Sequence, residues 1–215
     1  MKKYDSILFD LDGTLTNSAE GITKSAAMVL DHYGIPYASL QDLTVFIGPP
    51  LRDTFPKFGV PSDEVEEAVA LFRKRYISVG KFENHPYEGM IPLLAKLKEE
   101  GYKLYVATSK PEVTAREILE HFHMTEYFEE IAGALMDGSR DEKEQVIAYL
   151  HDTCDVQGKA LMVGDTDFDI IGASHCGLDS IGVSWGFGST ESMRKAGAVA
   201  IVSTMDELYD FVHVK

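Results

Sequence analysis

Short apolar runs alternate along this chain with segments of helical periodicity, and this alternation limits the fold more than any other feature. We expect buried strands at 7–9, 104–107, 161–163 and 198–202, with a weaker candidate at 181–183. Between them we expect helices at 91–100, 112–122, 143–150, 170–176 and 205–212. Because apolar strands that alternate with helices are typical of a parallel sheet covered on both faces, the sequence predicts an α/β fold.

Polar residues and glycines mark the expected ends of these helices. Three pairs have the spacing of a capping box: Ser109 with Glu112, Ser139 with Glu142, and Thr204 with Glu207. Two glycines stand where helices should end: Gly101 and Gly177.

The segment 16–86 differs from the rest because it has helical patterns and no convincing strand. Amphipathic helices are expected at 18–33 and 63–79, with a loop-rich stretch around 45–52 between them. We interpret 16–86 as an inserted helical domain. The main sheet domain is then built from 1–15 and 87–215.

Net charge, cysteine content and the length of the apolar runs argue against several classes of protein. The 215 residues carry a formal net charge of -15, which disfavours nucleic acid and anionic membranes as partners. The chain has two cysteines in no paired motif, which suits a reducing compartment. The first apolar run is too short for a signal-peptide core, and no stretch approaches the about 20 apolar residues of a membrane span. We therefore expect a cytoplasmic protein.

Two carboxylates follow the first expected strand directly, in the segment Asp10-Leu11-Asp12-Gly13-Thr14. Ligands bind at the carboxyl edge of an open parallel sheet, so these residues are candidates for a site. The spacing lets Asp10 face a substrate, while Asp12 offers a main-chain carbonyl and a separately oriented carboxyl group. A plain turn is the alternative, since Asp and Gly are common turn residues.

Three more carboxylates follow the strand at 161–163, in Gly164-Asp165-Thr166-Asp167-Phe168-Asp169. Helix capping explains one acid at a helix start better than it explains three. Three crowded carboxylates repel one another unless a cation lies among them. Oxygen ligands favour a hard ion, and Mg²⁺ fits a partly hydrated site shared with phosphate.

Two further features, the pair Thr108-Ser109 and Lys143, are weaker candidates for the same sheet edge when each is considered alone. The Thr108 hydroxyl could bind a phosphate oxygen, with help from the amides of the following helix, while Ser109 could cap that helix. Lys143 stands near an expected helix start, where a lysine is usually solvated, and nothing local distinguishes it.

Taken together, these segments resemble the haloacid dehalogenase superfamily, in its aspartyl-phosphate phosphatase branch, over essentially the whole chain. The resemblance implies a Rossmann-like doubly wound parallel sheet with an inserted α-helical cap domain. It also implies catalytic roles: Asp10 as nucleophile, Asp12 as general acid and base, and Thr108 and Lys143 as ligands of the phosphoryl oxygens. The implied Mg²⁺ ligands are Asp10, Asp12 through its carbonyl, Asp165 and, through a bound water, Asp169.

Two positions distinguish this chain from other branches of the superfamily and favour phosphatase chemistry. Dehalogenases lack an acid at the position of Asp12, and transport ATPases carry a lysine where Leu11 stands here. The loop 48–52 resembles the phosphoglycolate phosphatase and small 5'-nucleotidase group, whose cap selects the substrate. In this chain Arg52, Lys110 and Ser109 are the candidates for substrate binding, since a guanidinium matches carboxylate or phosphate well. A surface salt bridge is the alternative for Arg52.

The sequence therefore predicts a Mg²⁺-dependent hydrolase of small phosphorylated metabolites, similar to a phosphoglycolate phosphatase. A 5'-nucleotidase or a pyrophosphatase with the same mechanism stays open, as do a sugar phosphomutase and a phosphate-binding regulator without turnover. We expect a monomer or a homodimer that binds a small phosphorylated substrate, with no nucleic acid and no membrane as partner.

Overall fold

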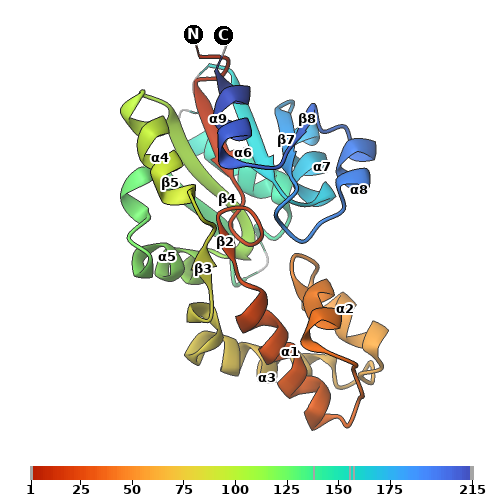
Figure 1. Cartoon of the computed structure of the whole chain (residues 1–215). Coiled ribbons are helices and arrows are strands. Elements are labelled where there is room, and N and C mark those ends of the chain that lie inside the picture. Colours follow the sequence, from red (N-terminus) through yellow and green to blue (C-terminus); the bar gives the residue numbers. More distant parts are fainter. Residues whose placement is uncertain (1, 138, 155, 157, 214–215) are drawn as a thin grey trace. The chain divides into compact units, whose positions relative to one another are not determined.

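A computed structural model describes residues 2–137, 139–154, 156 and 158–213, and Figure 1 shows its elements. Within the described residues, one sheet contains six parallel strands in the order β5-β4-β1-β6-β7-β8. Their bounds are β1 Ser6–Phe9, β4 Lys103–Pro111, β5 Glu130–Ala134, β6 Ala160–Gly164, β7 Asp179–Val183 and β8 Ala200–Val202. Strands β4 and β5 lie on one side of β1, and β6, β7 and β8 lie on the other. This order is that of a doubly wound sheet, so the predicted Rossmann-like α/β fold is confirmed.

Helices cover both faces of this sheet because side chains alternate along each strand. Ile7 and Phe9 of β1 pack into a cluster with the first set of helices: α4 Met90–Glu99, α5 Glu112–His121 and α9 Met205–Val212. Leu8 points to the other face, where it packs with α6 Lys143–Thr153 and α7 Asp167–His175. Helix α8 Thr190–Ala196 and the 3-10 helix Thr125–Tyr127 complete this part of the chain.

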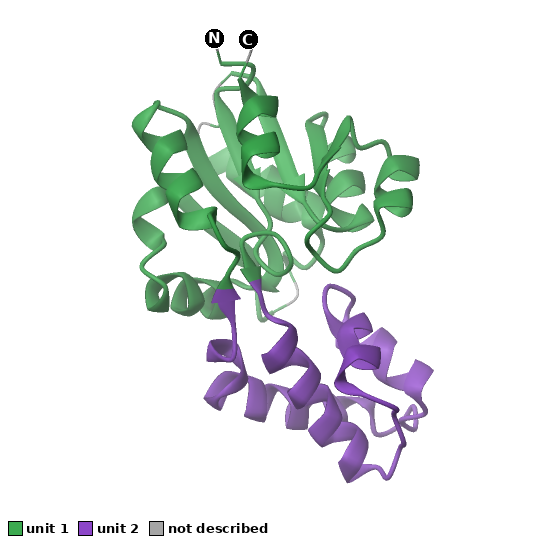
Figure 2. Cartoon of the chain, in the orientation of Figure 1, with its two compact units in different colours: residues 1–16, 86–215 green, residues 17–85 purple. Residues whose placement is uncertain are grey.

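The chain divides into two compact units, coloured separately in Figure 2: residues 1–16 with 86–215, and residues 17–85. These boundaries lie one residue from those expected at each junction. Unit 2 is helical, with α1 Ala19–His32, α2 Leu51–Phe58, α3 Val65–Ser78 and 3-10 helices at Leu40–Phe46 and Gly80–Phe82. The short strands β2 Thr16–Asn17 and β3 His85–Pro86 pair at the junctions.

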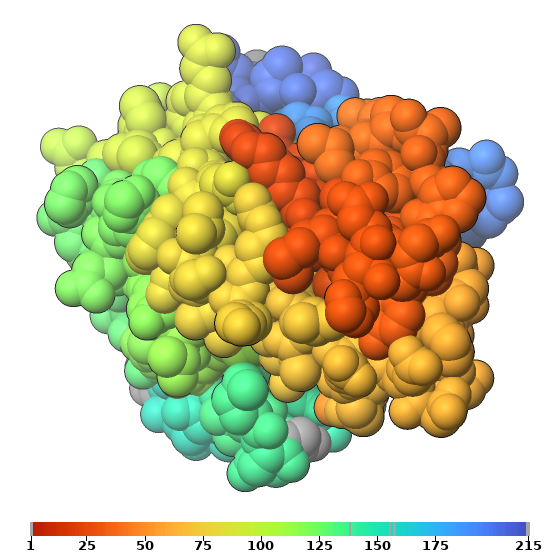
Figure 3. All heavy atoms as spheres, turned by 90° about the horizontal axis from the view of Figure 1, so that it is seen from below, coloured from red at the N-terminus to blue at the C-terminus, as the bar shows by residue number. Residues whose placement is uncertain are grey.

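Unit 2 has its own close packing. Figure 3 shows the red-orange segment of α1 and the golden segment of α3 side by side on its surface. Gly21 lets α1 approach the 3-10 helix Gly80–Phe82, since a Cβ there would lie 1.9 Å from the Gly80 carbonyl oxygen. Beside this crossing, the Arg75 guanidinium donates two hydrogen bonds to Glu83 and one to Ser25.

Several features differ from the expectations. The sequence does not predict strand β5 or helices α2 and α8. Two predicted capping boxes are wrong: β4 extends through Ser109 and α5 begins after Pro111, while α6 begins after Glu142 instead of Ser139. The Thr204 cap is confirmed, because its side chain accepts a hydrogen bond from the Glu207 amide.

The expected helix ends at two glycines are confirmed, since Gly101 and Gly177 follow α4 and α7 with φ of +83° and +72°. Among the residues described, no helix combines the length and apolar character needed to cross a bilayer.

Candidate active site

Strand β1 ends at the residue before Asp10, and a tight loop follows it. The Asp10 amide still donates to the Val163 carbonyl, at 2.9 Å, so the sheet fixes the backbone of this residue. Gly13 adopts φ +86°, a conformation that favours glycine, and its amide donates to the Thr16 carbonyl at 2.8 Å. The loop therefore turns back sharply at the carboxyl edge of the sheet.

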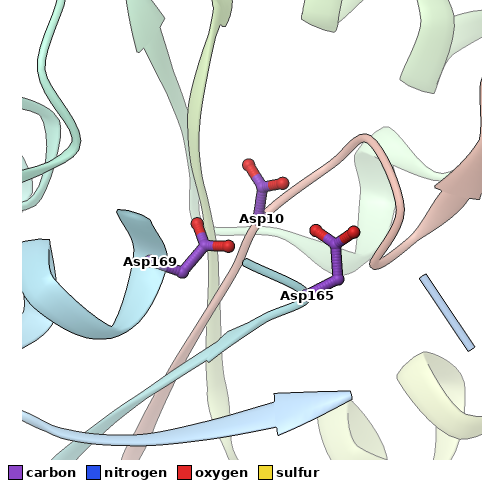
Figure 4. A group of neighbouring side chains, drawn as sticks. All are labelled: Asp10, Asp165 and Asp169. Atoms are coloured by element: carbon purple, nitrogen blue, oxygen red, sulfur yellow. The ribbon is translucent and has the colours of Figure 1, made fainter. Parts of the chain in front are cut away.

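Three carboxylates from separate elements converge at this edge (Figure 4). Asp10 follows β1, Asp165 follows β6 and Asp169 lies in the first turn of α7. One ligand oxygen from each lies within 4.8 Å of the other two. The residues are 8%, 1% and 1% exposed, so these charges lie out of bulk water.

Lys143 supplies a positive charge to this cluster. Its Nζ lies 2.6 Å from Asp10 Oδ1 and 2.8 Å from Asp169 Oδ1, and it donates to the Ala107 carbonyl at 2.8 Å. Helix α7 approaches α6 closely here, because a Cβ on Gly172 would lie 2.8 Å from the Lys143 side chain. The lysine at the start of α6 is therefore buried and fully engaged.

Burial dominates the electrostatics of the cluster. It raises the pKa of Asp10 to about 6, with the Lys143 charge acting in the opposite direction and that of Asp169 adding to the rise. The pKa of Asp165 is also raised well above its usual value, by burial first and then by the charges of Asp169 and Asp10. Burial alone would lower the pKa of Lys143, but the carboxylates of Asp10 and Asp169 raise it.

Asp165 is held by a second loop that follows β7. The Phe187 amide donates to Asp165 Oδ2 at 2.8 Å. Two glycines leave no room for a side chain, since a Cβ on Gly13 or Gly186 would lie 2.1 Å or 2.4 Å from that same oxygen. The Trp185 indole N–H also ties this loop to the first one, through the Thr14 carbonyl at 3.1 Å.

These residues fit a hard divalent cation. Asp165 Oδ1 is buried and has no hydrogen-bond partner among the described residues. Asp169 has its Oδ2 occupied by the Thr166 amide and hydroxyl, at 3.0 and 2.9 Å, and its Oδ1 by Lys143. Three buried carboxylates with one lysine leave negative charge uncompensated, and an all-oxygen donor set favours an ion such as Mg²⁺.

The remaining predicted residues of unit 1 lie at the ends of β1 and β4. The Thr108 side chain is buried, and its Oγ1 accepts from the Lys110 amide at 3.2 Å. The Lys110 Nζ donates to Asp12 Oδ2 at 2.5 Å, while Asp12 Oδ1 is buried with no hydrogen-bond partner among the described residues. Ser109 is exposed.

Arg52 belongs to unit 2, at the start of α2. Its guanidinium donates to both carboxylate oxygens of Glu66, at 2.6 and 3.0 Å, and both side chains are exposed. The salt-bridge alternative therefore describes its observed contact, and its role in substrate binding stays a prediction.

Sequence reasoning missed the backbone contacts from the loop after β7. Nearly every residue type has a backbone amide, so the residue type at position 187 does not indicate that its amide contacts Asp165. The available signal was the pair Gly186 and Gly188, because a Cβ at Gly188 would lie 2.0 Å from the Asp165 carbonyl oxygen.

Comparison with known proteins adds an independent line of evidence. Residues 7–183 match the family model described as haloacid dehalogenase-like hydrolase. A 5'-nucleotidase from Pseudomonas aeruginosa is 44% identical over 194 residues, which are 89% of this chain and 88% of that protein. Tyrosine-protein kinase PtkA from Mycobacterium tuberculosis is 40% identical over 97% of this chain and 72% of that protein.

A phosphoglycolate phosphatase from Aquifex aeolicus is 34% identical over 84% of this chain and 85% of that protein. Among solved structures, a predicted phosphatase from Clostridium acetobutylicum superposes with a TM-score of 0.91 at 43% identity, covering 97% of this chain and 98% of that one. The family match spans β1 to β7 and so includes the converging carboxylates. The chain therefore belongs to the haloacid dehalogenase-like hydrolase family, among its phosphatases.

Proposed function

We propose that this protein hydrolyses small phosphate monoesters in a Mg²⁺-dependent reaction that passes through an aspartyl-phosphate on Asp10. One observation carries the proposal: Asp10 is a buried carboxylate that contacts the Lys143 ammonium and lies beside two further carboxylates at the carboxyl edge of the sheet. A phosphatase needs both a nucleophile and a means to neutralise the phosphoryl charge, and this arrangement supports both needs.

The reaction would occur in two displacements. In the first, an Asp10 carboxylate oxygen forms a bond to phosphorus while the bond from phosphorus to the leaving oxygen breaks. Asp12 gives a proton to that leaving oxygen. In the second, water attacks the phosphorus, Asp12 takes a proton from the water, and the Asp10–phosphorus bond breaks to release inorganic phosphate.

Other residues would hold the phosphoryl group and the metal. In this proposal Thr108 would donate to phosphoryl oxygens from the end of β4, and Lys143 would do so from the start of α6. Asp10 and Asp165 would ligate Mg²⁺ directly, together with the Asp12 carbonyl, and Asp169 would orient a ligand water. A bound Mg²⁺ would supply charge neutralisation to the phosphoryl oxygens.

The substrate class rests on the relatives. A phosphoglycolate phosphatase and a 5'-nucleotidase are both similar over most of this chain, which supports a small phosphorylated metabolite. Phosphoglycolate is our first candidate. A nucleoside monophosphate and pyrophosphate are the alternatives that share the mechanism.

The test is phosphate release from a panel of phosphorylated metabolites, with Mg²⁺ and with EDTA, using Asp10→Asn as the blank. The panel includes phosphoglycolate, nucleoside monophosphates, pyrophosphate and a hexose phosphate supplied with its bisphosphate. We expect Mg²⁺-dependent release that disappears in Asp10→Asn, and the ranking by kcat/KM identifies the substrate class. A folded wild-type protein that releases phosphate from none of these compounds contradicts the proposal.

A second arm of the same experiment addresses the kinase relative. Incubation with radiolabelled ATP and Mg²⁺ reports any transfer to tyrosine, the activity named for PtkA. Stable tyrosine labelling with no phosphate release would replace hydrolysis by transfer to tyrosine as the function.

A further inference from the structure

Asp12 and Lys110 form an ion pair that is separate from the three converging carboxylates. The Lys110 Nζ lies 2.5 Å from Asp12 Oδ2, and the two side chains are 6% and 14% exposed. Among the described residues, the group of converging ligand oxygens comprises Asp10, Asp165 and Asp169, and Asp12 is not in it. Lys143 therefore contacts two of the converging carboxylates, whereas Lys110 contacts Asp12.

The backbone around Lys110 is fixed from several directions. The pairing of β4 with β5 is irregular between Ala107 and Pro111, and the Lys110 amide turns to the Thr108 side chain. Gly133 of β5 packs directly against this segment, since a Cβ there would lie 2.6 Å from the Lys110 carbonyl oxygen. The lysine therefore extends from a rigid strand end instead of a mobile loop.

A buried arginine reinforces that strand end. Arg140 is 7% exposed, and its Nε donates to the Gly133 carbonyl at 2.8 Å. It also forms an ion pair with Glu112, whose Oε2 accepts from the Gly133 amide at 3.3 Å. These contacts bind β5 to the start of α5, directly after Lys110 and Pro111, and so support the position of the lysine.

The ion pair makes the two oxygens of Asp12 different. Oδ2 is occupied by Lys110, whereas Oδ1 is buried and has no hydrogen-bond partner among the described residues. A buried polar atom without a partner in a native structure calls for an explanation, and a functional partner is one. An anchored Oδ2 fixes the direction in which Oδ1 points.

We propose that Lys110 is a positioning residue for Asp12: it holds Oδ2 so that Oδ1 is the oxygen that gives a proton to the leaving group and later takes one from water. This inference rests on the proposed function and deepens it. Lys110 acts through Asp12 in this account, without needing to contact the substrate. The alternative role, binding of an anionic substrate group by Lys110, predicts a different pattern of kinetic effects.

The test uses Lys110→Met, which keeps the length and apolar stem of the side chain and removes the ammonium. The substrates are alkyl and aryl phosphates of equal charge that differ in the basicity of their leaving group. kcat/KM is the measured quantity, because it reports the steps up to release of that group. Lys103→Met is the matched control, since Lys103 pairs with Glu129 on the exposed surface.

A residue that orients the general acid matters most when the leaving group is basic. We expect Lys110→Met to lower kcat/KM about 10–100-fold for alkyl phosphates and only about 3-fold or less for p-nitrophenyl phosphate. In an Asp12→Asn background, Lys110→Met should cause no further loss for any substrate, since residues that act as a unit are not additive. The Mg²⁺-induced rise in Tm should persist in Lys110→Met, which shows that the variant is folded.

Two results would overturn the inference. An equal loss for alkyl and aryl phosphates that also adds to the Asp12→Asn loss would assign Lys110 to substrate binding or to stability alone. Unchanged kinetics in Lys110→Met would leave it no role in catalysis. Failure of the proposed function gives a different result, because the wild-type protein itself would then show no release that depends on Asp10.

Discussion

Lys143 Nζ lies 2.6 Å from Asp10 Oδ1, although the two residues are 133 positions apart in the sequence. The same ammonium lies 2.8 Å from Asp169 Oδ1. One cation thus contacts two buried carboxylates that lie far apart in the sequence. Its removal should affect both the reaction and the free energy of unfolding.

Lys143→Met tests both effects. Loss of a charge that neutralises the phosphoryl group should lower kcat about 10²–10³-fold, as for other preorganised electrostatic groups. In EDTA, the free energy of unfolding should fall by about 3–5 kcal/mol, because Asp10 and Asp169 lose their buried counter-charge. Urea unfolding of Lys143→Met and of Asp10→Asn/Lys143→Met checks this, since the double variant should regain part of the loss. An unchanged unfolding midpoint in Lys143→Met would contradict the ion pairing.

Asp12→Asn separates proton transfer from metal binding. We expect kcat/KM for alkyl phosphates to fall about 10²–10⁴-fold, since the amide cannot act as the acid. The variant should keep the Mg²⁺-induced rise in Tm, because the carbonyl proposed as a ligand remains. Calorimetric thermal scans with and without Mg²⁺, beside the activity assay, provide the measurement. Normal turnover in Asp12→Asn would rule out its acid and base role.

The raised pKa values of Asp10 and Asp165 predict a pH dependence for the metal-free protein. A carboxyl group whose pKa is higher in the folded state than in the unfolded state binds more protons in the folded state. The free energy of unfolding therefore falls as pH rises from the unfolded-state pKa of that group to its folded-state pKa. For Asp10 this interval runs from the ordinary value of about 4 to about 6. In EDTA, the unfolding free energy should therefore decline over this range.

Asp165→Asn should reduce that decline and raise the stability of the metal-free protein above wild type at pH 8. The same change should abolish the rise in Tm on addition of Mg²⁺, because a ligand that binds only the folded state stabilises it. Urea titrations in EDTA across pH, followed by thermal scans with Mg²⁺, give both results. A Mg²⁺ shift equal to that of wild type would exclude Asp165 as a ligand.

Gly13→Ala tests the close approach of the first loop to Asp165. A Cβ at Gly13 would lie 2.1 Å from Asp165 Oδ2, so the carboxylate must move. Gly177→Ala is the matched control, since Gly177 also has positive φ but nothing within 4 Å of its added Cβ. Both variants should lose about 1–2 kcal/mol of stability from backbone strain. Only Gly13→Ala should also lose the Mg²⁺ shift; equal Mg²⁺ shifts in the two would contradict the crowding.

The fold was predictable where the pattern is strong. β1 and β6 contain continuous apolar runs, and helices such as α4 and α5 have clear apolar periodicity. Strand β5 escaped prediction because its sequence, Glu130–Ala134, is short and rich in Ala and Gly, which have weak strand propensity. The cap expected at Ser109 failed for a tertiary reason, since pairing with β5 keeps the chain extended as far as Pro111.

The site was predictable in part. The acidic segments 10–14 and 164–169 can be recognised in the sequence because each follows a buried strand. The structure places Asp10, Asp165 and Asp169 together. Lys143 has no local signal, so only the family resemblance indicated it. The contact of Lys110 with Asp12 depends on an irregular strand register and joins residues 98 apart, and sequence spacing contains no trace of either.

The central claim is that a phosphoryl group resides on Asp10, and chemical trapping tests it most directly. Borohydride reduces an acyl phosphate to an alcohol, so quenching a reaction during turnover should convert residue 10 to homoserine, identified by peptide mass spectrometry. The account predicts this conversion with substrate and Mg²⁺, and its absence with EDTA or without substrate. Turnover with Asp10 unmodified after quenching, or homoserine at another aspartate, would contradict it.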